Sequence, residues 1–400
     1  AGWIYALGIG WDAITDPYMG YIAERTRTKM GSYRPYIFFG SIPLALSFIL
    51  LFWVPPFEGS LLFVFLIIVN IFHRTCFTIV SVPYSSLTAR ISDDSEERTK
   101  LTTARMLGAS FGTLSISALG FPIINWFGSG EESLGFVYLG ICSGLAAILI
   151  LAITVKTVKE RNFDIEFSKL PSFSEVSKSI VNNYAFLIVF ASTLTLITTS
   201  IMFNKNLIYY TKYALGLHEF QGLILGVSSA SAFLAIPIWA YFALKIGKRN
   251  SWLISMSLLV FSFLFFYLYP IKNLIELLIV LIALGIGNGA TGVLFWSMLP
   301  DTIEYGEWKT GVRTESSLYG FMTFAQKGGI AISALILGML LTNIGFIPNT
   351  VQSEETLESL KSLMTFIPLA GVVLSFILVY FYPIDSKFHK KLIREINERS

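Results

Sequence analysis

Long apolar segments recur from one end of the chain to the other and constrain its fold more than any other feature. A helix needs about 20 apolar residues to cross the hydrocarbon core of a bilayer. Of the 400 residues, 54% are hydrophobic and only 14% are charged, whereas soluble domains average about 25% charged residues. We therefore predict an all-α membrane protein, since helices satisfy every backbone hydrogen bond within lipid. The eleven predicted transmembrane helices cover residues 2–24, 36–54, 61–89, 102–127, 134–155, 184–211, 220–243, 251–269, 273–299, 316–342 and 363–382.

Lys and Arg in the connecting segments predict the orientation, because cytoplasmic loops are enriched in these residues. One set of connections, which includes the C-terminal tail, holds 23 of them, and the opposite set holds only Lys212, Lys272 and Lys361. We expect the first set, and with it the C-terminus, to be cytoplasmic in a multi-pass protein of the plasma membrane (the inner membrane of a bacterium). The net charge of +3 is too small to indicate nucleic-acid binding. Cys76 and Cys142 both lie in apolar segments, so neither a disulfide framework nor a cysteine metal site is expected.

The longest polar connection divides the predicted helices into groups of five and six. Charged loops recur six helices apart, because residues 24–34 correspond to 245–250 and residues 92–100 correspond to 300–313. Two six-helix halves related by a parallel repeat are typical of the major facilitator fold. Eleven helices of an expected twelve would then be present, with the first one missing. The predicted parts are an N-terminal bundle (1–155, helices II–VI), a cytoplasmic linker (156–183), a C-terminal bundle (184–383, helices VII–XII) and a cytoplasmic amphipathic tail (384–400).

Two acids lie one turn apart on one face of the first predicted helix. An ionised side chain in the middle of a bilayer costs on the order of 2.5–3.5 kcal/mol, so Asp12 and Asp16 require a reason. Pro17 cannot donate to the carbonyl of Ala13, which leaves a further oxygen between the acids. Together with Thr15, these are hard oxygen ligands that suit Na⁺, Li⁺ or H⁺. We predict a site for a coupling cation, which is a metal site at Asp12 and Asp16 if sodium binds. The alternative is that the acids pair with bases only to hold helices together.

The helix at 61–89 carries a polar stripe. Arg74, Thr78, Ser81 and Ser85 follow one another at intervals of four, three and four residues on an otherwise apolar helix. We predict Thr78 as a further cation ligand and the other three as the lining of a substrate cavity. Close helix packing through small polar residues is the alternative, and it is weaker for Arg74 than for the serines.

Other polar residues within the predicted spans are isolated. Lys327, with Thr323 one turn before it, lies near the middle of its helix, where it could bind substrate oxygens or balance the two acids. A purely structural ion pair remains an alternative for Lys327. Lys205 lies near the outer end of its helix, and we expect it to extend to the membrane interface. His73 has no partner at ligand spacing, so we interpret it as a packed residue.

Charged residues gather at two predicted cytoplasmic junctions and in the tail. Salt bridges among them could hold one access state shut, with solvated loop charge as the alternative. The tail alternates apolar and basic residues, which predicts a helix lying on the inner surface. The junction residues are Asp301, Glu304, Glu307 and Arg313 at one helix junction and Lys248 and Arg249 in another loop.

Three segments resemble the glycoside–pentoside–hexuronide:cation symporter family. They are WDAITDPYMGYIAERTRTKMGSYRP (11–35), VPYSSLTARISDDSEERTKLTTAR (82–105) and DTIEYGEWKTGVRTESSLYGFMTFAQK (301–327), in the family's order and spacing. The resemblance implies twelve helices, with helix I absent here. It also implies a role for nine residues. These are cation ligands at Asp12, Asp16, Thr15 and Thr78, charged groups near the sugar and cation sites at Arg105 and Lys327, and gate ion pairs at Asp301, Arg313 and Arg249.

The sequence also departs from that family. Ser81 and Ser85 stand where the family's best-known member has a sugar-binding acid and a tryptophan, and Arg74 adds a positive charge. An anionic sugar, such as a uronate or a sulfonated sugar, therefore becomes a more credible substrate than a neutral galactoside. The motifs DAITDP and VPYS occur in similar form in animal lysophospholipid symporters.

We predict a secondary active transporter that moves a sugar or glycoside together with Na⁺ or H⁺ by alternating access. Its expected partners are the sugar, the coupling cation and the lipid bilayer, with no nucleic acid, and we expect it to function as a monomer. We expect no cofactor besides the coupling ion and no enzymatic activity, because the sequence lacks GxxxxGK[ST] and HExxH. The alternatives are a lysolipid symporter and a transport-inactive sensor on the same fold.

Overall fold

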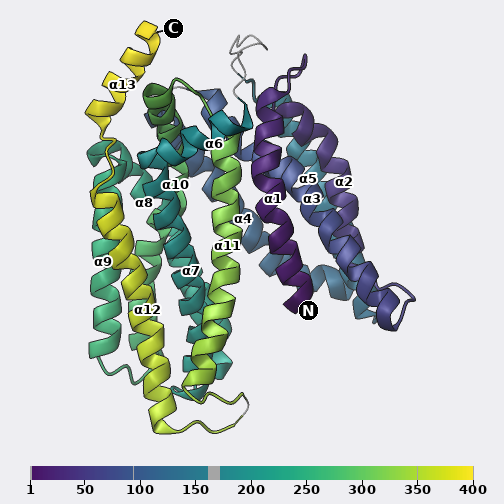
Figure 1. The fold of residues 1–400 in the computed structure, drawn as a ribbon. Coiled ribbons are helices and arrows are strands. Elements are labelled where there is room, and N and C mark those ends of the chain that lie inside the picture. The colour runs from purple at the N-terminus through teal and green to yellow at the C-terminus, as the bar shows by residue number, and fades with distance from the viewer. Residues whose placement is uncertain (1, 93, 161–171, 349, 400) are drawn as a thin grey trace. The chain divides into compact units, whose positions relative to one another are not determined.

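The computed structural model describes residues 2–92, 94–160, 172–348 and 350–399, and helices dominate this part of the chain (Figure 1). Residues 161–171 of the predicted linker lie outside the described residues. The helices are α1 (Gly2–Arg25), α2 (Arg34–Phe52), α3 (Gly59–Ile91), α4 (Ser95–Gly128), α5 (Glu132–Thr157), α6 (Phe173–Asn182), α7 (Tyr184–Tyr213), η2 (His218–Phe220), α8 (Gln221–Ile246), α9 (Lys248–Leu268), α10 (Leu274–Thr310), α11 (Glu315–Asn343), α12 (Glu354–Tyr380) and α13 (Ser386–Arg399).

Nine helical segments in the described part of the chain are long and apolar enough to cross a membrane. They are α2, α3, α5, η2 with α8, α7, α9, α10, α11 and α12. The all-helical membrane architecture is thereby confirmed. The count of eleven spans stays a prediction, because α1 and α4 are not among the nine.

Several helices extend past the ends predicted from apolarity. Helix α10 continues beyond residue 299 to Thr310, and residues 300–306 of this extension are buried, with Asp301 and Glu304 in ion pairs. Helix α4 begins at Ser95 rather than 102, because the carboxylate of Asp94 accepts from the amides of Glu96 and Glu97 and caps it. Apolar segments indicate which residues lie in the bilayer, whereas capping residues determine where the helix itself begins.

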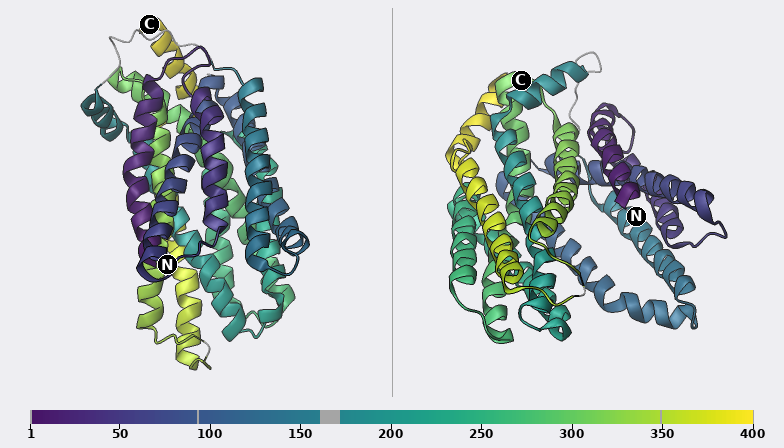
Figure 2. Two further views of the ribbon diagram at one scale, coloured as in Figure 1. Left: turned by 90° about the vertical axis from the view of Figure 1, so that its right-hand side faces the viewer. Right: turned by 60° about the horizontal axis from the view of Figure 1, so that its bottom comes forward.

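The chain forms two compact units. The first contains residues 1–98, 108–180 and 310–324, and the second contains 99–107, 181–309 and 325–400. Within the first unit α2 packs against α3 and α5, and α1 packs against α3 (Figure 2). Within the second, α12 packs against α7 and α9, and α8 packs against α9.

Close backbone packing holds α1 against the beginning of α11 inside the first unit. A Cβ built on Gly20 would lie 2.3 Å from the carbonyl oxygen of Ser316, and one on Gly320 would lie 2.4 Å from that of Asp16. No residue larger than glycine fits these positions without moving a backbone. The backbone of the acid-bearing helix is therefore fixed on this side, while α3 faces its acidic side chains.

Candidate functional site

The polar stripe of α3 meets the two acids of α1. Asp12 and Asp16 are both 0% exposed. Arg74 forms an ion pair with Asp12, and its Nε donates to Oδ1 of Asn70 at 3.0 Å. The Thr78 hydroxyl donates to Oδ1 of Asp16 at 2.5 Å. The structure thus brings together four of the residues that the sequence singled out on two separate helices.

Glycine makes room for the arginine in this group. A Cβ built on Gly8 would lie 2.2 Å from Nε of Arg74, whereas one on Gly10 would meet nothing within 4 Å. Arg74 can therefore cross the face of α1 to reach Asp12 because position 8 has no side chain. The group formed by Asp12, Asp16 and Arg74 contains two carboxylates and one guanidinium.

Thr15 is not brought into contact with these acids through its hydroxyl. That hydroxyl donates to the carbonyl of Trp11 in its own helix at 3.1 Å. Trp11 in turn donates from Nε1 to the hydroxyl of Thr75 at 2.9 Å, which links α1 to α3 a second time. A ligand role for Thr15 stays a prediction.

Farther along α3, two serines continue the stripe. Ser85 is 7% exposed, and the hydroxyl of Ser81 is buried without a hydrogen-bond partner among the described residues. An unsatisfied buried hydroxyl costs about 1–3 kcal/mol, so Ser81 is suited to meet a polar ligand.

The remaining predicted substrate residues lie in different surroundings. The guanidinium of Arg105 lies 4.1 Å from the ring centroid of Trp296 within the second unit. The hydroxyl of Thr323 donates to the Tyr319 carbonyl at 2.9 Å within the first unit, and Lys327 belongs to the second. Substrate contacts at these three positions stay predictions.

Sequence reasoning missed a cavity of about 600 Å³ in the second unit. Lys205 lines this cavity, and the expectation that it extends to the membrane interface stays a prediction. The polar run Asn204, Lys205 and Asn206 in an apolar helix was a signal that could have revealed it. The lining residues are Thr193, Leu196, Ile197, Ser200, Ile201, Asn204, Lys205, Ile208, Leu225, Ser228, Ser229, Ala232, Trp252, Gly285, Asn288, Thr291 and Phe295.

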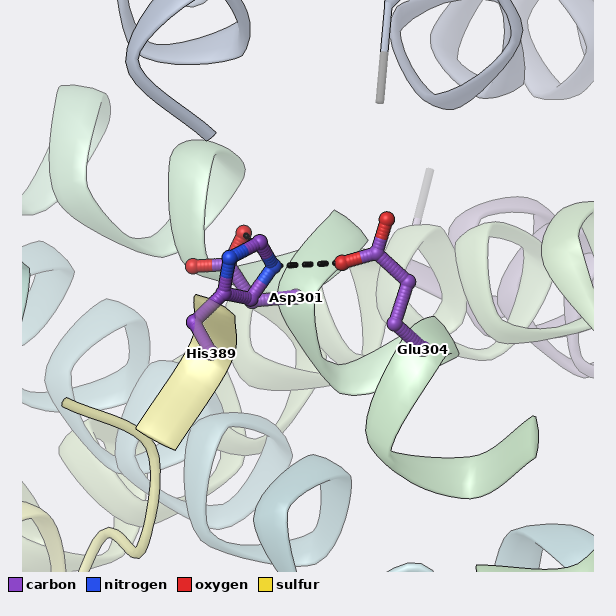
Figure 3. A group of neighbouring side chains, drawn as sticks. All are labelled: Asp301, Glu304 and His389. Atoms are coloured by element: carbon purple, nitrogen blue, oxygen red, sulfur yellow. Dashed lines mark hydrogen bonds and ion pairs between the residues drawn. The ribbon is translucent and has the colours of Figure 1, made fainter. Parts of the chain in front are cut away.

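One charged cluster joins the end of α10 to the tail helix α13 in the second unit (Figure 3). Nε2 of His389 lies 2.5 Å from Oε2 of Glu304 and 3.7 Å from Oδ1 of Asp301. Lys248 donates from Nζ to Oδ2 of Asp301 at 2.7 Å. The predicted gate residues Lys248 and Asp301 are therefore in contact, whereas Arg249 donates to the carbonyl of Tyr380.

Burial and charge act in opposite directions on His389. Burial lowers its pKa and so does Lys248, but the charges of Asp301 and Glu304 and the hydrogen bond to Glu304 outweigh both, so the pKa is raised. Ligand atoms of Asp301, Glu304 and His389 lie within 4.8 Å of one another, a spacing that could hold a metal ion. Two cationic side chains already balance the two carboxylates, so the geometry also fits a plain ion-pair cluster.

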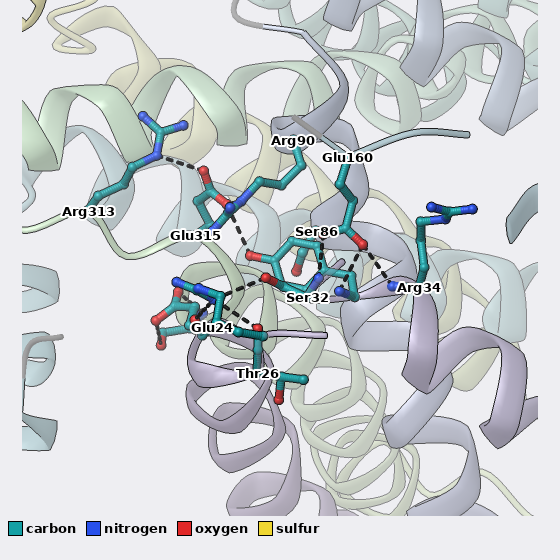
Figure 4. Close-up of polar contacts among 12 residues, drawn as sticks. Glu24, Thr26, Ser32, Arg34, Ser86, Arg90, Glu160, Arg313 and Glu315 are labelled. Atoms are coloured by element: carbon teal, nitrogen blue, oxygen red, sulfur yellow. Dashed lines mark hydrogen bonds and ion pairs between the residues drawn. The ribbon is translucent and has the colours of Figure 1, made fainter. Parts of the chain in front are cut away.

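A second cluster lies in the first unit (Figure 4). Glu315, at the beginning of α11, forms ion pairs with Arg90 of α3 and with Arg313, whose Nε is 2.7 Å away. The hydroxyl of Tyr33 donates to the same carboxylate at 3.0 Å. Arg313 thus pairs with an acid two residues away, and Glu315 is a charged residue that the sequence analysis did not single out.

The sequence analysis did not single out two further acids, Glu24 and Glu160. Glu24 accepts from the amide of Ser317 at 3.0 Å and from its hydroxyl at 3.1 Å. Glu160 accepts from the backbone amides that precede and begin α2, with donor–acceptor distances of 2.8–2.9 Å (Figure 4). These residues are Ser32, Tyr33 and Arg34.

Comparisons with known proteins place these features in a family. The family described as MFS/sugar transport protein matches residues 1–386. A glucuronide carrier protein homolog of Escherichia coli (strain K12) is 27% identical over 405 residues, which cover 100% of this chain and 87% of that protein. The isoprimeverose transporter of Lactiplantibacillus pentosus is 28% identical over 395 residues, which cover 97% of this chain and 81% of that protein.

A solved structure shares the fold. The crystal structure of the E. coli fucose:proton symporter matches with a TM-score of 0.68 at 14% identity and covers 96% of this chain and 90% of that chain. The predicted major facilitator fold and the resemblance to glycoside–pentoside–hexuronide symporters are thereby confirmed. The chain belongs to the MFS/sugar transport protein family, whose members are multi-pass membrane transporters.

Proposed function

We propose that the protein is a secondary active transporter of the plasma membrane that carries a sugar or glycoside together with a monovalent cation by alternating access. The observation that carries the proposal is the buried pair Asp12 and Asp16, held by Arg74 and Thr78 of the neighbouring helix. Two buried carboxylates one turn apart repel each other, and a cation or a shared proton relieves that repulsion. Coupling to an ion gradient requires a buried group that is most stable when a cation is bound to it.

The two acids have different surroundings, which suggests different roles. Arg74 largely offsets the charge of Asp12, whereas Asp16 receives a neutral hydroxyl from Thr78. We place the cation next to Asp16, with Asp12 and the Thr78 hydroxyl completing an oxygen-rich environment. Oxygen ligands of this kind suit Na⁺, Li⁺ or H⁺ and not the softer transition metals.

Coupling follows if cation and sugar stabilise the same arrangement of helices. A cation that neutralises the acids would order α1 against α3 and so favour one arrangement of the helices. By thermodynamic reciprocity, a sugar that binds this arrangement better would raise the affinity for the cation by the same factor. Relatives named as a glucuronide carrier homolog and an isoprimeverose transporter support a sugar or glycoside as the substrate class.

The two ion-pair clusters supply elements that can break and re-form during transport. One holds the beginning of α11 to α3 through Glu315, and the other holds α13 to α10 through His389. Alternating access commonly repacks such interactions. We propose that both clusters lie on the cytoplasmic side, as the distribution of Lys and Arg predicts.

The decisive test is uptake by purified full chain in proteoliposomes. A panel of radiolabelled sugars and glycosides, with lysophosphatidylcholine as a separate arm, is offered with and without an inward Na⁺ gradient at two pH values. We expect one sugar class to accumulate against its gradient, and Asp16→Asn to abolish accumulation while the thermal unfolding midpoint stays near that of the wild type. The matched control Glu219→Gln changes an exposed acid outside the site and should retain uptake.

Two outcomes would contradict the proposal. Full accumulation by Asp16→Asn would show that this acid does not couple transport to the cation. Accumulation of the lysolipid without any sugar would move the chain to the alternative substrate class.

A further inference from the structure

The cavity of the second unit contains one cationic side chain and no acidic one among its described lining residues. Lys205 extends from α7 and is exposed to the cavity. Among the described residues, no carboxylate lies within ion-pair distance of its Nζ. The cavity therefore has a positive charge that the residues around it do not balance.

Lys205 lies well inside its helix, so its charge requires a polar or charged partner. It precedes the end of α7 at Tyr213 by eight residues, and a rise of about 1.5 Å per residue places it about 12 Å from that end. Tyr209, Tyr210 and Tyr213 occupy the intervening turns, as tyrosines do at a membrane interface. An ammonium group at this depth is costly unless water or an anion meets it, and a cavity open to a ligand provides both.

The other lining groups suit a polyhydroxylated ligand. Asn204 and Asn288 offer amide donors and acceptors, and Ser228 and Ser229 offer hydroxyls. Phe295 and aliphatic side chains of α7 form an apolar wall. A few polar groups on a mostly apolar lining are usual for small-molecule sites.

Glycines of α10 hold this wall in place. A Cβ built on Gly285 would lie 2.7 Å from the Ser228 carbonyl oxygen, and one on Gly289 would lie 2.5 Å from the Ala232 carbonyl oxygen. Helices α8 and α10 therefore touch through their backbones on either side of Asn288. Through these glycines, the run LGIGNGATG packs the two helices closely. This packing fixes the backbone position from which the Asn288 side chain extends.

We propose that Lys205 binds the acidic group of the transported sugar in this cavity, so that the substrate is a carboxylated or sulfonated sugar. This inference rests on the proposed transport function and names its substrate class. It assigns anion recognition to α7 and away from Arg74, which the structure pairs with Asp12. Asn204 and Asn288 bind sugar hydroxyls beside the acidic group.

The test measures binding to the purified full chain in detergent, without any gradient. The probes are D-glucuronate and 6-deoxy-6-sulfoglucose, each against D-glucose, followed by calorimetry and by the thermal unfolding midpoint. For the wild type we expect at least one acid to bind about tenfold or more tightly than glucose, as expected of a charged hydrogen bond. The two acids distinguish a carboxylate from a sulfonate.

Three variants separate charge from folding. Lys205→Gln should lose about tenfold or more in affinity for the acid with unchanged glucose binding, and Lys205→Arg should keep most of the preference. Lys212→Gln removes a lysine of the same helix that is outside the cavity lining, and it should behave as wild type. The wild-type unfolding midpoint in all three would show that they fold.

The result that overturns the inference is a wild-type protein that prefers neither acid, or a preference that survives Lys205→Gln. This outcome is distinct from failure of the proposed function. Symport of a neutral sugar that is indifferent to Lys205→Gln would refute the anion subsite alone, whereas acid-selective binding without cation-driven uptake would refute the symport alone.

Discussion

Replacing Glu315 by glutamine should destabilise the first unit strongly. Its carboxylate is 1% exposed and is in contact with Arg90, Arg313 and the Tyr33 hydroxyl. Glutamine keeps the shape of the side chain and removes its charge, so Arg90, with a side chain only 6% exposed, becomes a buried cation without its counter-charge at Glu315. Removing one partner from a buried ion pair costs about 3–5 kcal/mol.

The two arginines should matter unequally. Arg313 is 14% exposed, and its loss leaves Glu315 paired with Arg90. We therefore expect Arg313→Gln to cost about 1 kcal/mol, the net value of one hydrogen-bonded contact. Arg90→Gln should cost more, and Glu315→Gln should cost most.

Thermal and denaturant unfolding of the purified protein in detergent, followed by tryptophan fluorescence, measures these differences. The double variant Arg90→Met with Glu315→Gln removes both buried charges of the pair and should recover much of the stability lost by Glu315→Gln alone, because an apolar replacement of a buried pair is often near neutral. Glu355→Gln changes an exposed acid and serves as the control. Strictly additive losses in the double variant would refute a coupled buried pair.

Two further predictions concern the tail and the cation site. Because the folded-state pKa of His389 is raised, the stabilisation from its protonated form is complete below the unfolded value near 6.5 and is lost as pH rises through the folded value. Amide hydrogen exchange of α13, corrected for intrinsic rates, should therefore become faster at high pH. His389→Gln should abolish this pH dependence, whereas a change at the exposed His218 should not; an unchanged profile in His389→Gln would contradict the assignment. Gly8→Ala places a Cβ against Arg74. We expect this variant to need a concentration of Na⁺ or H⁺ about tenfold higher than the wild type for the same rise in the thermal unfolding midpoint. Gly10→Ala meets nothing and is the control, and equal effects of the two substitutions would argue against a positioning role for Gly8.

The fold could be read from the sequence because its main determinant is local. Apolar segments placed α2, α7 and α9 to within a few residues of the observed helices. The predictions failed where a helix continues past its apolar segment, as at the end of α10, and where a short helix, α6, forms in the polar linker. Hydropathy indicates which part of a helix lies in lipid. It gives no signal for the helical turns that extend beyond the lipid.

The sequence could predict which residues of a candidate site share one face of a helix, but not which helix faces meet. The spacing of Thr78, Ser81 and Ser85 predicted one polar stripe, and the spacing of Asp12 and Asp16 predicted one acidic face. That the two faces meet follows from the packing of α1 on α3, which no local pattern encodes. Glu315 and the cavity that Lys205 lines were missed for the same reason, since each depends on residues distant in sequence.

The pairing of Arg74 with Asp12 changes how the charges of the first unit are to be understood. From sequence alone, we predicted a cation for the acids, with pairing to bases of the protein as the alternative, and an anionic sugar near the arginine. Their contact satisfies part of both requirements within the protein. The cation that we propose beside Asp16, and the positive charge of Lys205 in a cavity of the second unit, are then the two features left to test. A transporter with this division would recognise its coupling ion and the acidic group of its substrate in different units. Neutralising Asp16 would then weaken cation binding directly and substrate binding only through coupling, and neutralising Lys205 would do the reverse.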